Sequence, residues 1–393
     1  MENKNKACKI VTIKEIIPLF KGTEKANTIE LVSFEEIGNK VVTGKRMYNP
    51  YDKALFIEPD YCLPDTELFH EYIAPNYDPK KSKLGKNNRI KAIKFNLHIG
   101  DNQPVYSYGI LIPIQEISKK GIIINNTIYE DDVDLDEALG ITKYEEPEPF
   151  QGHKGQVISC PFPEQMYKTD ETNINNIIND IEFPIYLIGS QKIDGSSISI
   201  WYKNGKFGIA SRNQGKPLTY KKVVGYKKPN LFFKLLKFLN ILNYDGRIIE
   251  LTQSDDQFVV MGKPYLEKII LFEKNIVLRG EMCGKSCKGS GNPNNPSAKE
   301  DNHIEFFGID DYTHSATRLP YSSVRRIAEN LNLPLVHTYF EQTFNSKEEL
   351  LSKCQEIFNA EKEKGKIIEG IVVRNETGLF SAKILNLLYD SLK

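Results

Sequence analysis

The segment Gln191–Ser197 places a lysine, an acid and a glycine between two apolar stretches. Ile185–Ile188 before it and Ile198–Tyr202 after it predict two buried strands, with Lys192 in the short connection. Gly195 allows a tight turn there. An amine attacks phosphorus when it is deprotonated and the phosphate charge is neutralised, so Lys192 is a candidate nucleophile. A surface hairpin with an ordinary solvated lysine is the commoner explanation of so short a motif, so the interpretation depends on the rest of the chain.

Further residues suited to phosphate chemistry follow in order along the chain. Acidic side chains can bind a metal ion, and basic side chains can neutralise phosphate charge. Each group lies in or at the end of a short apolar run that predicts a strand. The groups are Ser211-Arg212, Arg279-Gly280-Glu281, Phe307-Gly308-Ile309-Asp310, Glu369-Gly370-Ile371-Val372-Val373-Arg374 and Lys383.

Helices are predicted between these strands. The last one has a capping box, Ser346 with Glu349, and ends at Gly365. The first is expected to be capped by Thr169 or Asp170. Helical spacing of apolar residues marks Ile174–Ile181, Lys221–Asn240, Tyr265–Phe272, Ser322–Asn330 and Lys347–Glu363. Residues 151–393 are therefore predicted to form an α+β domain, with antiparallel strands around one pocket.

Residues 1–150 are predicted to form a smaller β-rich domain. Turn residues separate its short strands, which suggests a small barrel such as the OB fold. The predicted strands are Ile10–Ile13, Ile29–Val32, Lys40–Thr43, Ala54–Ile57, one near Ile90–Phe95, and Tyr106–Leu111.

Basic residues form two local clusters. Lys86, Arg89 and Lys91 lie among tyrosines, a pattern that suits a nucleic-acid backbone and base stacking, although a solvated lysine-rich loop also fits. Lys221 and Lys222 belong to a second basic stretch. These clusters are local, because 52 basic and 52 acidic residues give the 393-residue chain no net charge.

The composition is that of a globular protein of two or three domains, with 40% hydrophobic and 26% charged residues. No apolar run is long enough for a membrane span, and no secretory signal is visible. Six scattered cysteines fit reduced thiols in the cytoplasm. The spacing of Cys283 and Cys287 is not that of a standard zinc pair, and no second pair follows, so both are expected to be free thiols.

Taken in order, the chemical groups resemble the nucleotidyltransferase motifs of ATP-dependent polynucleotide ligases and mRNA capping enzymes. The resemblance covers about residues 160–390. Capping enzymes and DNA ligases of this superfamily place an OB domain after the last motif, whereas ten residues follow Lys383 here. An OB-like segment upstream resembles the Naegleria and Deinococcus type of RNA ligase. The sequences of five upstream segments also resemble that family: Ala54–Pro59, Asn88–Ala92, Ser107–Ile110, Leu139–Tyr144 and Lys168–Glu171.

The resemblance implies an N-terminal OB-like barrel followed by an antiparallel-sheet, ATP-grasp-like nucleotidyltransferase domain that uses ATP and Mg²⁺ or Mn²⁺. Lys192, Glu369 and Lys383 would be catalytic, with Glu369 binding the metal through water and Lys383 contacting the α-phosphate. Lys192 must lose the proton that a free lysine holds up to a pKa near ~10.4. Glu281 would accept a hydrogen bond from the ribose. The implied nucleotide-binding residues are Lys192, Asp194, Gly195, Arg212, Glu281, Phe307, Ile309 and Lys383.

Two positions depart from the related ligases. Strand alternation puts Phe307 and Ile309 on one face, where they would cover the adenine, but relatives usually have an aromatic residue in place of Ile309. Phage RNA ligases have two lysines in the last motif, and here the second position is Leu385. The missing charge either slows a step or is compensated by another cation.

The implied reaction is ATP-dependent joining of 3′-hydroxyl and 5′-phosphate ends. ATP adenylates Lys192, AMP passes to the 5′-phosphate, and the 3′-hydroxyl displaces AMP. The expected partner is RNA or an RNA-containing nicked duplex, and the expected protein is a cytoplasmic monomer. Three alternatives stay open: a GTP-dependent capping-type guanylyltransferase, a DNA ligase, and a non-catalytic RNA-binding protein derived from a ligase. The changes at Ile309 and Leu385 are the evidence for the last.

Overall fold

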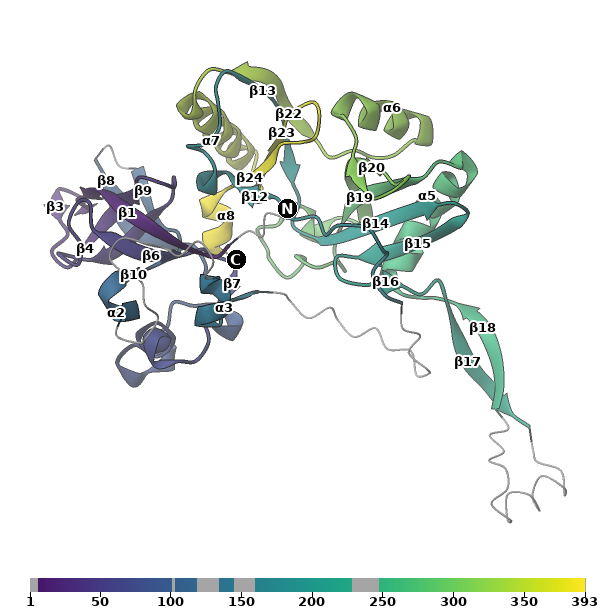
Figure 1. Cartoon of the computed structure of the whole chain (residues 1–393), viewed down its shortest axis with the longest axis horizontal. Helices are drawn as coiled ribbons and strands as arrows, with labels where there is room; N and C mark the ends of the chain where they lie inside the picture. Colours follow the sequence, from purple (N-terminus) through teal and green to yellow (C-terminus); the bar gives the residue numbers. More distant parts are fainter. Residues whose placement is uncertain (1–5, 101–102, 119–133, 145–159, 228–246, 393) are drawn as a thin grey trace, which may run out of the picture.

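The computed structural model describes residues 6–100, 103–118, 134–144, 160–227 and 247–392. Antiparallel sheets dominate, and few helices accompany them (Figure 1). The predicted α+β class is confirmed. The predicted domain boundary at residue 150 lies outside the described residues.

The N-terminal region is built around a five-stranded sheet in the order β10-β6-β1-β4-β5. Val11, Phe34 and Phe56 pack on one another in its core. The strands are β10 (Ile110–Pro113), β6 (Lys53–Ile57), β1 (Cys8–Ile17), β4 (Ile29–Phe34) and β5 (Lys40–Gly44). A four-stranded sheet contains β3 (Glu24–Lys25), β2 (Phe20–Lys21), β8 (Ile93–Ile99) and β9 (Gln103–Ser107). Assignment of this region to the OB fold stays a prediction.

Short elements complete the N-terminal region. The two-stranded pair of β7 (Tyr61–Cys62) and β11 (Thr142–Lys143) brings residue 143 back beside residue 61. The helices are α1 (His70–Ile73), α2 (Ile114–Ser118) and α3 (Leu135–Leu139). Asp134 caps α3, and Gly140 ends it in the left-handed conformation with φ +68°.

The first C-terminal sheet has the order β12-β24-β23-β13-β22. Helix α7 (Lys347–Glu363) covers one face, where Leu350 and Phe358 pack against Leu187 and Ile371. Ser346 caps this helix as predicted, accepting a hydrogen bond from the Glu349 amide at 3.2 Å. The strands are β12 (Thr172–Asn173), β24 (Ser381–Leu385), β23 (Gly370–Arg374), β13 (Ile185–Lys192) and β22 (Thr338–Phe344).

The second C-terminal sheet has the order β16-β15-β14-β19-β20-β21. Helices α5 (Gln257–Phe272) and α6 (Tyr321–Leu331) pack on it through Leu266 and Val324, which share a core with Ile200 and Leu278 (Figure 1). The strands are β16 (Gly215–Lys216), β15 (Lys206–Ser211), β14 (Ser196–Lys203), β19 (Ile276–Cys283), β20 (His303–Asp311) and β21 (Thr317–Arg318). The chain passes from the first sheet to the second between β13 and β14, which places the lysine motif at their junction.

Outside the lysine motif, three predictions of secondary structure are wrong. Ile174–Ile181 contains only a 3₁₀ turn, Ile174–Asn176, because Asn173 caps it in an extended conformation and the isoleucines pack into the first sheet. Tyr106–Leu111 is two strands, since Gly109 breaks the run with φ +105°. Residues 221–226 belong to strand β17 (Thr219–Tyr226), not to a helix, because they pair with β18 (Arg247–Gln253).

The β17–β18 hairpin projects away from the rest of the chain (Figure 1). The remainder of the predicted Lys221–Asn240 helix lies mostly beyond the described residues, which stop at 227 and resume at 247. The side chains of Lys221 and Lys222 are also outside the description, so their predicted role stays a prediction.

The N-terminal and C-terminal regions contact each other through hydrogen bonds, one of them between buried side chains. The Asn173 side chain donates to the Tyr108 hydroxyl at 2.9 Å, and the Ala92 amide donates to Asp390 of α8 (Leu387–Leu392) at 3.2 Å. Asn176 also donates to Glu58. Among the described residues, no helix has the length and apolarity needed to cross a membrane.

Candidate active site

A pocket of about 590 Å³ lies where these parts of the fold meet. Both C-terminal sheets contribute to it, through residues that include Lys192, Glu281 and Lys383. The N-terminal region contributes Arg89 and Lys143. The pocket therefore needs residues from both ends of the chain.

Lys192 is the last residue of β13 rather than part of a loop. Antiparallel pairing sets it opposite Gly370, the residue after Glu369. The Lys192 Nζ lies 2.5 Å from Glu369 Oε2, and both side chains are largely buried. The amine and the carboxylate predicted to work together are thus brought into contact by strand register.

Asp194 and Gly195 form the turn after Lys192. The Tyr389 hydroxyl donates to Asp194 Oδ2 at 2.7 Å, which ties the last helix to this turn. The Asn295 side chain donates to the Asp194 carbonyl at 3.0 Å. A Cβ at Gly195 would lie 2.2 Å from the Met282 carbonyl oxygen, so only glycine allows β14 and β19 to approach here.

Glu281 lies on β19, opposite Ser197 of β14. Burial raises its pKa to about 8, the Lys192 ammonium opposes this rise, and the charges of Glu369 and Asp194 add to it. The resemblance implies a metal bound through Glu369, and this carboxylate lines the pocket beside Lys192. Carboxylate oxygens are hard donors of the kind that Mg²⁺ binds, often together with water and phosphate oxygens, so Glu369 fits the implied metal.

Three cations converge on the Asp170 carboxylate. Arg212 donates to its Oδ2 at 3.2 Å, Lys383 Nζ lies 3.6 Å from its Oδ1, and Lys143 forms a close ion pair with it. Burial and, to a smaller extent, the charges of Lys383 and Arg212 together lower the pKa of Lys143 to about 8. Burial followed by the charge of Lys192 also lowers the pKa of Lys383. The cluster can hold an anion with several oxygens.

The predicted adenine shelf is only partly present. Phe307 lines the pocket, but Ile309 is fully buried in the core between the second sheet and its helices. Arg279 and Gly280 of β19 pair with Gly308 and Phe306, so Phe307 is a bulged residue and the alternation of faces breaks there. The expectation that Phe307 and Ile309 share a face is wrong, and Phe307 packs against the cluster of Ile193, Cys283 and Val336.

Two motif residues have a structural role. Arg279 Nε donates to Asp310 Oδ2 at 2.7 Å, and its NH1 donates to Ser199 at 2.9 Å. Both ion-pair partners are buried between β19 and β20. The Arg279–Asp310 ion pair therefore joins the neighbouring strands β19 and β20 and does not line the pocket.

Among the predicted nucleic-acid residues whose side chains the structure describes, only Arg89 lines the pocket. Arg89 donates from Nε to Asp60 at 2.9 Å and lies 4.9 Å from the ring centre of Tyr144. Lys86 is exposed and Lys91 is half-buried. Arg89 is thus held in the pocket wall, while Lys86 faces solvent.

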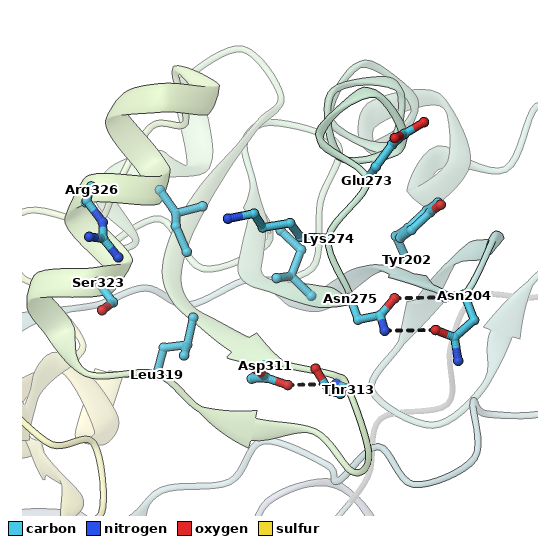
Figure 2. A pocket seen from close by; sticks show the side chains of 12 residues that line it. Tyr202, Asn204, Glu273, Lys274, Asn275, Asp311, Thr313, Leu319, Ser323 and Arg326 are labelled. Carbon is cyan, nitrogen blue, oxygen red and sulfur yellow. Dashed lines mark hydrogen bonds between the residues drawn. The ribbon is translucent and has the colours of Figure 1, made fainter.

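Sequence analysis did not identify Lys143 and Asp170 as site residues, although both lie in strings that resemble the ligase family. Leu385, the residue in place of a second lysine, also lines the pocket. A separate hollow of about 500 Å³ lies beside β20 and α6, where Lys274, Asp311 and Arg326 are among the lining residues (Figure 2). None of the predicted site residues lines this second hollow.

A family model described as RNA ligase matches residues 185–385, slightly more than half of the chain. The chain belongs to the RNA ligase family. Its fold resembles that of Naegleria gruberi RNA ligase determined with PPi, with a TM-score of 0.67 and 20% identity over 98% of this chain and 97% of that one.

A variant of the Naegleria gruberi enzyme determined with ATP and Mn gives a TM-score of 0.69 at 19% identity, covering 98% of both chains. Another variant, with AMP and Mn, gives 0.67 at 20% identity and covers 98% of this chain and 97% of that chain. No curated protein matched the sequence.

Proposed function

We propose that this protein is an ATP-dependent RNA ligase that joins 3′-hydroxyl and 5′-phosphate ends, at nicks in duplexes that contain RNA. The observation that carries the proposal is the arrangement of Lys192 beside Glu369, with three cations a short way along the same pocket. Membership of the RNA ligase family supports it. The choice of ATP as the nucleotide is supported by the structures of Naegleria gruberi RNA ligase, which were determined with ATP, AMP and PPi.

In the first step Lys192 Nζ attacks the α-phosphorus of ATP, the bond to the bridging oxygen breaks, and pyrophosphate leaves. The amine needs its lone pair, and Glu369 at 2.5 Å is placed to accept its proton or to orient it. The phosphates would displace Asp170 from Lys383, Arg212 and Lys143. These three cations would then neutralise the negative charge of the phosphates. Glu281 would accept a hydrogen bond from the ribose, and Phe307 would cover the base.

In the second step the 5′-phosphate of RNA attacks the phosphorus of the lysyl-AMP and releases the Lys192 amine. In the third step the 3′-hydroxyl attacks the activated 5′-phosphate, a phosphodiester forms, and AMP leaves. Glu369 would hold Mg²⁺ or Mn²⁺ through water, and the metal would neutralise phosphate charge when bound. The same pocket serves each step by positioning and charge neutralisation.

Lys86, Arg89 and Lys91 would hold the RNA backbone, together with Lys221 and Lys222. Because these contacts neutralise phosphates, RNA affinity should fall with salt. We also propose that the protein works as a monomer in the cytoplasm, where thiols such as its six free cysteines stay reduced.

The deciding experiment is the intact mass of the protein after incubation with ATP and Mg²⁺. We expect a gain of one AMP in the wild type and no gain in Lys192→Ala. Lys206→Ala is a matched control, because that exposed lysine lies on β15, away from the pocket lining. A gain with GTP alone would support the capping reaction instead, and no gain with either nucleotide would support a non-catalytic protein.

A further inference from the structure

A cysteine, a histidine and a glutamate meet behind the pocket, in a group that the proposed ligase chemistry does not use. Cys283 ends β19 and His303 begins β20, and the two residues are paired across the strands. Glu305 lies two residues further along β20, so its side chain points to the same face as that of His303. Their sulfur, nitrogen and oxygen atoms all lie within 4.8 Å of one another.

The distances within the group match those around a tetrahedral metal ion. Cys283 Sγ lies 3.2 Å from His303 Nε2, and this nitrogen lies 3.4 Å from Glu305 Oε1. Bonds of about 2.3 Å from Zn²⁺ to sulfur and about 2.1 Å to nitrogen and oxygen place sulfur about 3.6 Å from nitrogen, and nitrogen about 3.4 Å from oxygen. Little movement separates the group from a coordination shell.

The histidine is also held as metal ligands are. His303 Nδ1 lies 2.7 Å from the Asp301 carbonyl oxygen, which can only accept, so this nitrogen carries the proton. In the neutral ring, Nε2 then presents its lone pair to the thiol and the carboxylate. Glu300 Oε2 lies 3.6 Å from the same nitrogen at the exposed edge of the group, and water can complete a tetrahedral shell there.

We propose that Cys283, His303 and Glu305 bind one Zn²⁺ ion, a structural metal site separate from the carboxylates beside Lys192. One thiolate, one imidazole and one carboxylate form a donor set that zinc takes readily, and Mg²⁺ does not. Binding releases the thiol proton to solvent. No cysteine pair is needed, which explains why the spacing of Cys283 and Cys287 did not indicate the site.

The ion would anchor the loop between β19 and β20 at both of its ends. That loop carries Asn295, whose side chain donates to the Asp194 carbonyl. Glu281 precedes Cys283 by two residues on β19. Zinc would therefore steady two elements that shape the nucleotide pocket without contacting the nucleotide.

Cobalt provides a direct test, because a Co²⁺–thiolate bond gives an intense near-ultraviolet charge-transfer band that carboxylate sites do not give. Chelator-treated full-length protein would be titrated with Co²⁺ in excess Mg²⁺, followed by Zn²⁺. We expect one Co²⁺ per chain with the thiolate band, and its displacement by one equivalent of Zn²⁺. Bound zinc should also raise the melting temperature of the wild type.

Cys283→Ser and His303→Gln should each weaken Co²⁺ and Zn²⁺ binding by at least about 100-fold. Loss of a residue that only hydrogen-bonds to a metal ligand costs up to about 100-fold, and loss of a ligand itself should cost no less. His303 is partly exposed, so this variant should fold even if the buried Cys283 variant does not. Cys354→Ser, at a buried cysteine in α7, should keep the band. Absence of the band in the wild type, or its persistence in both ligand variants, would overturn the site. The outcome is independent of AMP transfer.

Discussion

The most informative single side chain is the carboxylate of Asp170. Lys143, Arg212 and Lys383 surround it within one pocket that also contains Lys192. Three positive groups at such short range repel one another, and a single carboxylate relieves that repulsion. Under the proposed function, the phosphates of ATP need the same three cations. Asp170 therefore competes with the substrate inside the free protein.

Asp170→Asn should tighten the binding of pyrophosphate by roughly 3–10-fold, since an amide competes weakly for cations. The same change should lower the melting temperature of the free protein, because the three cations lose their anion. Calorimetric titration and thermal melts would measure both effects. Asp180→Asn is a suitable control, at an exposed acid that is not part of the pocket lining. Weaker pyrophosphate binding in Asp170→Asn would contradict the competition.

Lys143 should make this binding depend on pH. Its pKa is lowered to about 8, so the charge is present below pH 8 and is lost as the pH rises through that value. In Lys143→Arg the guanidinium stays charged. The pyrophosphate affinity of the wild type relative to this variant should therefore fall by up to about 10-fold between pH 7 and pH 9. A ratio that does not change with pH would show that Lys143 does not take part.

Among the elements, the connection from β13 to β14 is the most constrained. Gly195→Ala would push a methyl group into the Met282 carbonyl, where neither backbone can yield, and we expect a loss of about 2–4 kcal/mol of stability and little AMP transfer. Gly205→Ala, in a hairpin with φ +78° and no atom within 4 Å, should cost about 1 kcal/mol by conformation alone. Chemical denaturation would measure both, and equal losses would contradict the steric argument.

The strands that carry the site could be predicted because their patterns are local. Ile185–Ile188 and Ile198–Tyr202 are runs of apolar and β-branched residues, and both lie in strands that are buried in the two sheets. That Lys192 and Glu369 act together was implied by the family resemblance, and the structure brings the two side chains into contact.

The missed features depend on contacts between distant segments. The bulge at Phe307 follows from its pairing with β19, which periodicity within β20 does not contain. Residues 221–226 have helical spacing, but pairing with β18 overrides it. Lys143 reaches the pocket because β11 pairs with β7, and Lys143 shows no local sign of this.

For the molecule as a whole, the N-terminal and C-terminal sheets complete one pocket, so their contact matters for function. Tyr108→Phe removes the hydroxyl that accepts from Asn173 and leaves a buried donor unpaired, at a cost of about 1–3 kcal/mol. We expect a lower melting temperature and a calorimetric transition that broadens or splits, as the two regions unfold less cooperatively.

Tyr106→Phe is the matched control for this change. Tyr106 lies two residues away on β9 and is only half-buried, so its loss of a hydroxyl should leave the transition nearly unchanged. Identical transitions in the two variants would mean that the Tyr108–Asn173 contact does not couple the regions.

The position of Asp170 has a consequence for selectivity in a cell, where inorganic phosphate and sulfate are abundant. The Asp170 carboxylate is part of the same chain as the three cations, so it acts at a high effective concentration. A free phosphate or sulfate ion contacts only these cations and must displace Asp170 without help from any other contact. ATP gains additional contacts through its base and ribose, and these offset the displacement of Asp170. The protein would thus bind nucleoside triphosphates in preference to free phosphate or sulfate, because only the nucleotides make several contacts with the pocket at once.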